Sequence, residues 1–343
     1  MDRKERFYRT IAREAVDHNA SWLGLPVEAA VPGLLRYFGV GSLSALKAHL
    51  GDDLYPVEMP YDSPTSQAIY TALDFSRRTH DSITDRTLTL PGFFSDLEDP
   101  DLVDTFDWPD PTAYIPVDRC RRLIRQVPSD AAVLGVIWSA HFQDTCAAFG
   151  MEQAFMAMLT CPDMVMAVDQ RIVDFYLKAN AIFYEATRGM LDAVLIGNDL
   201  GSQRGLMISP EQVRRFVLPG ARRLIKQAKK YGLTVFYHSC GSIEPIIPDL
   251  IDCGVDVIHP IQALAAGMEP QHLRLTYGNR VSFCGGVDTQ ELLARQTPEQ
   301  VFATVMALRR IFPTGLVLSP SHEAILPDVN PANIAAMFKA VHA

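Results

Sequence analysis

His238 and Cys240 stand two positions apart at the end of an apolar, β-like run, 233–237. Side chains alternate along a strand, so these two point the same way. Imidazole nitrogen and thiolate sulfur are donors that zinc prefers, and the pair therefore predicts half of a zinc site. Spacing alone also allows the alternative of a hydrogen-bonded histidine and a buried cysteine that merely end a strand.

Polar residues with ligand chemistry follow the other β-like runs as well. The runs are 132–138, 193–196, 233–237, 255–258, 280–283 and 316–318. The residues that follow them are Ser139 and His141, Asn198 and Asp199, His238 and Cys240, His259 and Gln262, Cys284 and Asp288, and Ser321 and His322. Strands end in polar loops, so part of this set consists of turn or cap residues. The histidines and cysteines indicate chemistry more strongly than the others.

Amphipathic helical patterns separate these runs. One pattern, 210–231, begins with Ser209 as a cap and proline at the first helical position, and 243–253 and 297–311 have the same character. Less regular β-like runs at 20–25 and 54–57 bring the strand count to eight. Eight strands that alternate with helices predict a (β/α)8 TIM barrel, whose active site lies at the C-terminal ends of the strands.

Residues 53–130 lack this rhythm and are rich in proline, aspartate and threonine, with a strongly acidic stretch at 96–110. We interpret them as an insertion within a single domain that spans residues 1–343. The insertion is either a lid over the barrel mouth or a solvated surface loop. The methionine-containing segment 151–166 has helical spacing and is expected to pack in the core.

Composition excludes several classes of protein. Of the 343 residues, 48% are hydrophobic and 21% charged, and the formal net charge is −9, which argues against a nucleic-acid partner. The N-terminus has mixed charge without the apolar core of a signal peptide, and we find no apolar run long enough to span a membrane. Six dispersed cysteines form no disulfide rhythm, so we expect a cytoplasmic protein with reduced thiols.

Several ordered motifs resemble the uroporphyrinogen decarboxylase superfamily. They lie at 237–243 (Tyr-His-Ser-Cys-Gly-Ser-Ile), 254–262, 283–290 (Phe-Cys-Gly-Gly-Val-Asp-Thr-Gln), 318–322 (Leu-Ser-Pro-Ser-His) and 329–337. The resemblance extends from about residue 191 to the C-terminus, with weaker support at 13–18. It implies a (β/α)8 barrel, in agreement with the strand count.

Two branches of the superfamily differ in residues that can be compared with this chain. True uroporphyrinogen decarboxylases carry an arginine-rich motif near the N-terminus that binds the substrate carboxylates, whereas residues 19–24 here contain no arginine. The cobamide-dependent methyltransferases carry a His-x-Cys pair and a third zinc ligand near the last strand. The resemblance to this second branch implies zinc ligands His238, Cys240 and His322, with histidine in place of the usual cysteine. Cys284 is the rival third ligand.

The same resemblance implies a methyl transfer between a small molecule, such as a thiol or methyl ether, and a corrinoid. Zinc serves such enzymes as a Lewis acid. The chain lacks the Asp-x-His-x-x-Gly pattern of corrinoid carriers, so the corrinoid is expected on a partner protein. A homodimer is compatible with the family.

Other site residues have roles that the sequence leaves open. Asp199 is the candidate catalytic residue, as an acceptor that orients a ligand histidine or as a proton carrier, and an N-cap is the alternative. Asn198, Gln262 and Asp288 are candidate substrate-binding residues. His259 is expected to be a hydrogen-bonded core histidine.

Two other functions remain open at this point. One is a cofactor-independent decarboxylase that acts on a porphyrinogen or a smaller organic acid, with Asp199 as the acid or base. The other is a barrel that binds a tetrapyrrole or corrinoid without turning it over.

Overall fold

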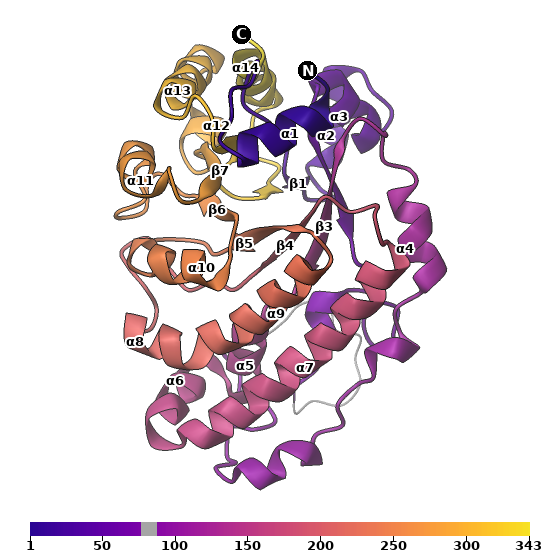
Figure 1. The fold of residues 1–343 in the computed structure, drawn as a ribbon, viewed down its shortest axis with the longest axis vertical. Coiled ribbons are helices and arrows are strands. Elements are labelled where there is room, and N and C mark those ends of the chain that lie inside the picture. Colours follow the sequence, from indigo (N-terminus) through magenta and orange to yellow (C-terminus); the bar gives the residue numbers. More distant parts are fainter. Residues whose placement is uncertain (77–87) are drawn as a thin grey trace.

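The computed structural model describes residues 1–76 and 88–343. Its main sheet curls around a central axis, with helices on the outside (Figure 1). Within the described residues this sheet has seven parallel strands in sequence order. They are β2 (Leu54–Glu58), β3 (Ala132–Trp138), β4 (Ala193–Gly197), β5 (Thr234–His238), β6 (Val257–Ile261), β7 (Ser282–Val287) and β8 (Leu316–Pro320). The predicted α/β barrel is therefore confirmed, and each of these strands overlaps a predicted run.

The predicted strand at 20–25 is not a regular strand of this sheet, although its residues close the barrel. Trp22 N donates to Leu318 O (3.0 Å), and Leu318 N donates to Ala20 O (2.8 Å). On the other side, Asp53 N donates to Ser21 O (3.3 Å), while Ser21 N donates to the Asp53 side chain (2.8 Å). Ser21 N thus donates to an aspartate side chain where a regular strand would donate to a backbone oxygen. The backbone hydrogen bonds between residues 20–25 and β2 therefore do not continue. The chain turns away instead, and β1 (Leu25–Pro26) pairs with β9 (Ala324–Ile325).

Alternation of side chains along the strands separates two cores. On β3, Leu134 and Val136 face the barrel interior, whereas Val133 and Ile137 pack against the outer helices. The interior core consists of Phe7, Ala20, Trp22, Leu54, Ala132, Leu134, Val136, Ala193, Leu195, Phe236, Val257, Cys284 and Val317. The barrel is thus filled along its axis, and open space for chemistry remains at its ends.

Helices surround the sheet, and α4, α7 and α9 lie side by side on one outer face (Figure 1). Thr297 forms a capping box with Gln300, and Ser209 caps the helical segment that follows it, as predicted. The α-helices are α1 (Arg3–Ile11), α2 (Val31–Phe38), α3 (Leu43–Leu50), α4 (Val117–Ile124), α5 (His141–Phe149), α6 (Met151–Thr160), α7 (Pro162–Ala186), α8 (Pro210–Gln212), α9 (Leu218–Lys230), α10 (Ile247–Cys253), α11 (Pro270–Tyr277), α12 (Leu292–Arg295), α13 (Pro298–Ile311) and α14 (Pro331–Val341).

Short helical turns complete the secondary structure. They are the 3₁₀ turns η1 (Ile69–Thr71), η2 (Pro100–Thr105), η3 (Pro111–Ala113) and η5 (Glu244–Ile246), and the π-helical turn η4 (Val213–Val217). The predicted helix at 210–231 therefore consists of α8, η4 and α9. The expectation that segment 151–166 packs in the core is confirmed in part, because Met158 and Met164 are buried whereas Met156 and Met166 are exposed. No helix in the described part of the chain is long and apolar enough to cross a membrane.

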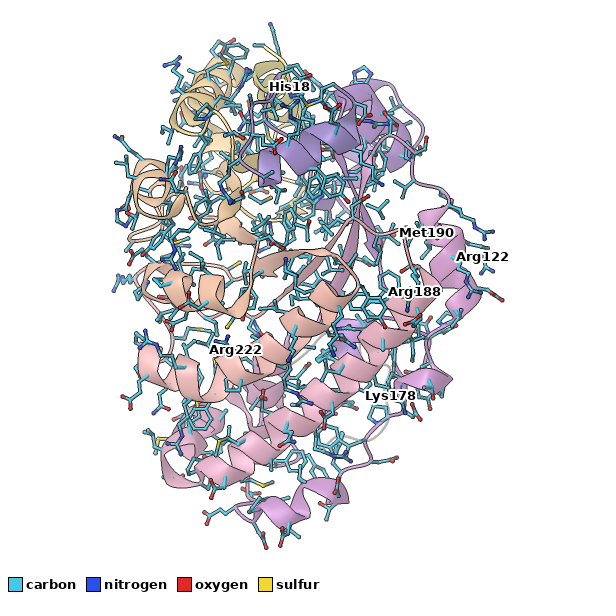
Figure 2. All side chains as sticks on the ribbon, in the orientation of Figure 1. His18, Arg122, Lys178, Arg188, Met190 and Arg222 are labelled. Carbon is cyan, nitrogen blue, oxygen red and sulfur yellow. The ribbon has the colours of Figure 1, made fainter. Side chains whose placement is uncertain are left out.

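The predicted insertion at 53–130 contains β2, which belongs to the barrel, followed by the turns η1 to η3 and α4. Residues 77–87 of this segment lie outside the described residues. Phe106 packs against Phe75 and Trp108, with ring centroids 4.8 and 4.9 Å apart. Two acidic residues form ion pairs with α7: Asp104 with Arg171 (2.7 Å) and Asp110 with Lys178 (2.9 Å). Lys178 is labelled in Figure 2. Its acidic stretch thus packs beside α7, and a lid function stays a prediction.

Candidate metal centre at the mouth of the barrel

Asp199, His238 and Cys240 meet where β4 and β5 end. Asp199 Oδ1 lies 3.1 Å from His238 Nε2 and accepts a hydrogen bond from Cys240 N (3.0 Å). Cys240 Sγ lies 3.5 Å from the same His238 nitrogen. The three ligand atoms all lie within 4.8 Å of one another, so they are close enough to share one ion.

Glycines allow the loops after β4 and β5 to approach this closely. A Cβ on Gly201 would lie 2.7 Å from Cys240 O, and one on Gly241 would lie 2.5 Å from the carbonyl carbon of Gly201. Gly241 also has φ +81°, which side chains rarely adopt. At the end of β4, a Cβ on Gly197 would lie 2.0 Å from His238 O. Side chains at these positions would push apart the loops that carry Asp199 and Cys240.

A second group lies on the other side of the His238 ring. His238 Nδ1 is 3.0 Å from His259 Nδ1 and 3.6 Å from Glu323 Oε2. All three residues are buried, and their ligand atoms again lie within 4.8 Å of one another. Glu323 Oε2 and His259 Nε2 are buried without a hydrogen-bond partner among the described residues. Such buried, unsatisfied polar atoms are rare in folded proteins and indicate a site for a missing polar group or ion.

His322 lies next to both His238 and Cys240. Its ring is perpendicular to that of His238, with centroids 6.5 Å apart, and its Nδ1 accepts a hydrogen bond from Ala324 N (3.1 Å). A hydrogen bond with the Cys240 sulfur raises the pKa of His322. Among the described residues, His322 belongs to neither group of ligand atoms within 4.8 Å. It borders the site, and ligation of the same ion requires its ring to move or turn.

Electrostatics at His238 favour positive charge. Burial alone would lower its pKa, but the Glu323 carboxylate and the hydrogen bonds with Asp199 and Cys240 outweigh burial and raise it well above the ordinary value. Burial raises the pKa of Asp199, yet the hydrogen bond and charge of His238 leave it below its ordinary value. For His259, burial and the neighbouring His238 lower the pKa, so its imidazole is neutral. Two groups of donors thus flank the His238 ring, Asp199 and Cys240 at Nε2 and His259 and Glu323 at Nδ1, and each group offers donors suited to a divalent cation.

Three other predicted site residues make structural hydrogen bonds. Asn198 is buried, accepts from Phe142 N (2.8 Å) and donates to the Tyr237 hydroxyl (3.2 Å). Asp288 accepts from Glu291 N and Leu292 N, at the start of α12. Gln262 Oε1 accepts from Gly241 N (2.9 Å), which supports the loop that carries Cys240. Gln262 therefore contacts the His-x-Cys loop through its side chain, and Asn198 contacts the same segment through its backbone N, which donates to His238 O (3.0 Å).

Cys284, the rival third ligand, lies inside the barrel core. It is fully buried beside Phe236 and Val317, and burial raises the pKa of its thiol far above the ordinary range despite a hydrogen bond with Ser319. A thiol held neutral in an apolar core is a poor zinc ligand.

His141 lies outside the site, where its Nδ1 is 2.6 Å from Asp169 Oδ1 between α5 and α7.

Two site residues escaped the sequence analysis, Glu323 and Trp138. Glu323 follows His322 directly in the sequence. Its position beside a possible metal ligand at a strand end could have indicated that it belongs to the site. The Trp138 ring is perpendicular to that of His238, with centroids 5.6 Å apart. Trp138 and Ser139 both have positive φ, +53° and +52°, at the end of β3. Such strained backbone concentrates at functional sites, although the sequence gives no sign of it.

Comparisons with known proteins agree with the geometry. A family model described as "Uroporphyrinogen decarboxylase (URO-D)" matches residues 85–343. A methylated-thiol–coenzyme M methyltransferase from Methanosarcina mazei is 32% identical over 96 residues, which cover 28% of this chain and 24% of that protein. The solved structure of a methyltransferase from Methanosarcina mazei superposes with a TM-score of 0.72 at 15% identity, over 99% of this chain and 98% of the other. The chain thus matches about a quarter of the curated relative, and the solved structure shows the shared fold.

Proposed function

The chain belongs to the uroporphyrinogen decarboxylase family, and we propose that it is a zinc-dependent methyltransferase. It moves a methyl group between a small thiol or methyl ether and a corrinoid carried by a partner protein. The observation that carries this proposal is the meeting of His238 Nε2 and Cys240 Sγ, 3.5 Å apart, beside a carboxylate at the barrel mouth. The names of the partial relative and of the structural neighbour support the same reaction class.

His238 and Cys240 would hold the zinc, with His322 as the third ligand. This set fits zinc because it combines two imidazoles with one thiolate and leaves a position for a substrate. Bound zinc would supply a Lewis acid that lowers the pKa of a substrate thiol or polarises an ether oxygen. The unsatisfied Glu323 Oε2 adds negative charge next to His238, which favours a dication there.

Asp199 would position the loop that carries Cys240, because zinc at His238 Nε2 would replace the hydrogen bond of that nitrogen with Asp199. Its side chain is 46% exposed, and one oxygen contacts both the His238 ring and Cys240 N. A carboxylate whose pKa lies below the ordinary value holds a proton poorly, which favours positioning over proton transfer. His259 is neutral and buried on the other side of His238, where it fixes the orientation of that ring.

The donor set argues against the decarboxylase alternative. A substrate with several carboxylates needs cationic side chains at the site. The residues grouped around His238 are instead two carboxylates, a thiol and imidazoles. We therefore retain methyl transfer as the one proposed function.

A methyl-transfer assay with free methylcobalamin tests the proposal. Zinc-loaded protein and 2-mercaptoethanol are expected to convert methylcobalamin to cob(I)alamin as the thiolate sulfur takes the methyl group and the thiol proton passes to solvent. The reaction is followed anaerobically by absorbance. His238→Ala and Cys240→Ser should lose activity by about 100-fold or more, because removal of one zinc ligand abolishes the site.

Cys161→Ser is the matched control, since Cys161 is partly exposed between α6 and α7 and is not among the grouped ligand residues. It should retain the rate of the unmodified protein. Equal rates for Cys240→Ser and the unmodified protein would contradict the proposal. Release of carbon dioxide from an organic acid by metal-free protein would support the decarboxylase instead.

A further inference from the structure

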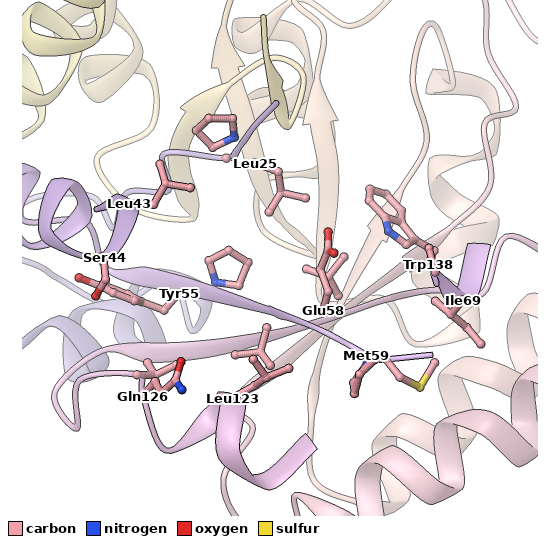
Figure 3. Close-up of a pocket in the computed structure, with 18 of the residues that line it drawn as sticks. Leu25, Leu43, Ser44, Tyr55, Glu58, Met59, Ile69, Leu123, Gln126 and Trp138 are labelled. Atoms are coloured by element: carbon pink, nitrogen blue, oxygen red, sulfur yellow. The ribbon is translucent and has the colours of Figure 1, made fainter. Parts of the chain in front are cut away.

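A cavity of about 530 Å³ lies between residues 23–26 and β2, and Trp138, which contacts the His238 ring of the candidate metal centre, forms part of its wall. Its walls include Leu23 to Pro26 on one side and Tyr55 to Pro60 on the other. The walls are mostly apolar, and Figure 3 shows Leu25, Leu43, Met59, Ile69 and Trp138 around it. This size and lining are typical of a site for a small organic molecule.

Glu58 is the one carboxylate among the residues that line this cavity. It pairs in register with Val136, whose side chain faces the barrel interior, so Glu58 faces the barrel mouth. Its side chain is exposed to solvent and has no hydrogen-bond or ion-pair partner among the described residues, so it is free to pair with a bound cation. The apolar walls desolvate the Glu58 carboxylate in part and raise its pKa, and a bound cation would favour its charged form.

The two cations that line the cavity do not neutralise Glu58. The Lys47 ammonium is paired with buried Asp52 and lies over the Tyr55 ring. Arg119 is exposed on α4. Its α4 neighbour Leu123 lies on the opposite side of β2 from Trp138 in Figure 3. Among the described residues, neither lining cation thus forms an ion pair with Glu58.

Trp138 connects this cavity to the metal centre. Its partly exposed ring lines the cavity and also contacts the His238 ring at 5.6 Å between centroids. The pairing of β3 with β4 shifts register between Val136 and Trp138, and such a bulge redirects a side chain. Figure 3 shows the Trp138 ring and the Glu58 side chain on the same side of β2. An aromatic face beside a carboxylate is the arrangement that recognises alkylated ammonium groups.

We propose that this cavity binds the positively charged end of the substrate, an alkylated ammonium or sulfonium group, between Glu58 and Trp138. The reacting end, a thiol or methyl ether, then reaches past Trp138 toward His238. The assignment of the reacting end rests on the proposed function, whereas the cation site stands on the cavity alone. The substrate class is thus cationic, because an anionic thiol such as a sulfonate would meet the Glu58 carboxylate.

Calorimetric titration of choline into the full chain tests the cation site. Choline carries no thiol, so its binding is measured on zinc-free protein and does not depend on the methyl-transfer reaction. 3,3-Dimethyl-1-butanol has the same shape without the charge and should bind at least 10-fold more weakly. Glu58→Gln should weaken choline binding at least 10-fold, and Trp138→Leu should weaken it as well.

Glu28→Gln is the matched control, because Glu28 is an exposed glutamate two residues beyond the cavity residue Pro26. It should leave the affinity for choline unchanged. The proposal is overturned if choline does not bind, if the neutral alcohol binds equally well, or if Glu58→Gln binds choline like the unmodified protein. The alcohol comparison uses unmodified protein and remains decisive if a variant does not fold.

A comparison of methyl-transfer rates with two thiols separates this proposal from the proposed function. In the methylcobalamin assay, 2-(dimethylamino)ethanethiol should react faster than 2-mercaptoethanesulfonate by 10-fold or more, and Glu58→Gln should remove that preference. Choline binding that depends on Glu58, without methyl transfer to either thiol, would support the cation site and contradict the methyltransferase. Methyl transfer to the two thiols at equal rates would contradict the cation site alone.

Discussion

His238 lies between two carboxylates that come from distant parts of the chain. Asp199 contacts its Nε2 at 3.1 Å, and Glu323 lies 3.6 Å from its Nδ1. Glu323 is buried with Oε2 unsatisfied, whereas Asp199 is partly exposed. Glu323 places negative charge on the Nδ1 side of the ring, and this charge strengthens Nε2 as a donor to a cation. We therefore propose that Glu323, as well as the ligands themselves, would contribute to the zinc affinity of the proposed site.

Replacement of Glu323 by glutamine tests this role. The amide keeps the shape and removes the charge, so zinc affinity is expected to fall about 10- to 100-fold. Competition with a chromogenic chelator measures the affinity. Glu291→Gln, at an exposed glutamate that pairs with Arg295, should leave it unchanged. Equal zinc affinities for Glu323→Gln and the unmodified protein would show that Glu323 has no part in the site.

At the scale of elements, the site depends on two loops that touch. Gly201 and Gly241 bring the loops after β4 and β5 into backbone contact, and this contact places Asp199 beside Cys240. Because each loop is fixed at the end of a buried strand, little freedom remains to absorb an added methyl group. The close approach of the loops is therefore a requirement of the site.

Gly241→Ala should separate the loops. The added Cβ would overlap Gly201 and Ser202, so zinc affinity is expected to fall at least 10-fold, while circular dichroism shows a retained fold. Gly232→Ala is the matched control, because Gly232 also has a positive φ (+74°) but has nothing within 4 Å of an added Cβ. Both variants carry the same kind of backbone strain. A similar loss of zinc affinity in both would contradict the contact argument.

The elements themselves were largely predictable from sequence. The run at 132–138 coincides with β3, because buried parallel strands are continuous apolar runs with clear ends. Residues 20–25 were predicted as a strand. The side chains of Asp52 and Asp53 accept the hydrogen bonds that backbone oxygens of β2 would accept in a regular strand pair. These contacts join residues some 30 positions apart, so no local sequence pattern reveals them. His238 and Cys240 were found from alternation alone. Glu323 was missed although it follows His322 directly, and Trp138 was missed because only the fold brings its ring beside His238.

At the scale of the whole molecule, a buried ion pair closes the barrel. Arg6 Nη1 lies 2.6 Å from Asp53 Oδ1, and the other oxygen of Asp53 accepts from Ser21 N. Both partners of the pair are buried. Burial raises the pKa of Asp53 to about 7, although the Arg6 charge lowers it. The Arg6 charge thus limits the rise in the pKa of this buried carboxyl, where residues 20–23 meet β2.

Arg6→Met should destabilise the fold in a manner that depends on pH. Removal of one partner from a buried pair costs about 3–5 kcal/mol of unfolding free energy. The folded pKa of Asp53 already exceeds the unfolded value of about 3.9, so its ionisation reduces stability as pH rises toward 7. Without Arg6 the folded pKa rises further. Urea denaturation should therefore show a larger loss at about pH 8 than at about pH 5.5.

Arg280→Met provides the comparison for that experiment. Arg280 pairs with Asp252 at 3.4 Å, and both side chains are at least half exposed. Exposed pairs of this kind contribute about 1 kcal/mol or less. A loss in Arg6→Met no larger than in Arg280→Met would show that closure of the barrel does not depend on the buried pair.

The metal content of protein purified without a His-tag tests the central claim most directly. Mass spectrometry of the elements should find one zinc per chain, and His238→Ala and Cys240→Ala should each lose it while Cys161→Ser keeps it. Unmodified protein that carries no zinc, takes up none when it is supplied and still transfers methyl groups would contradict the account.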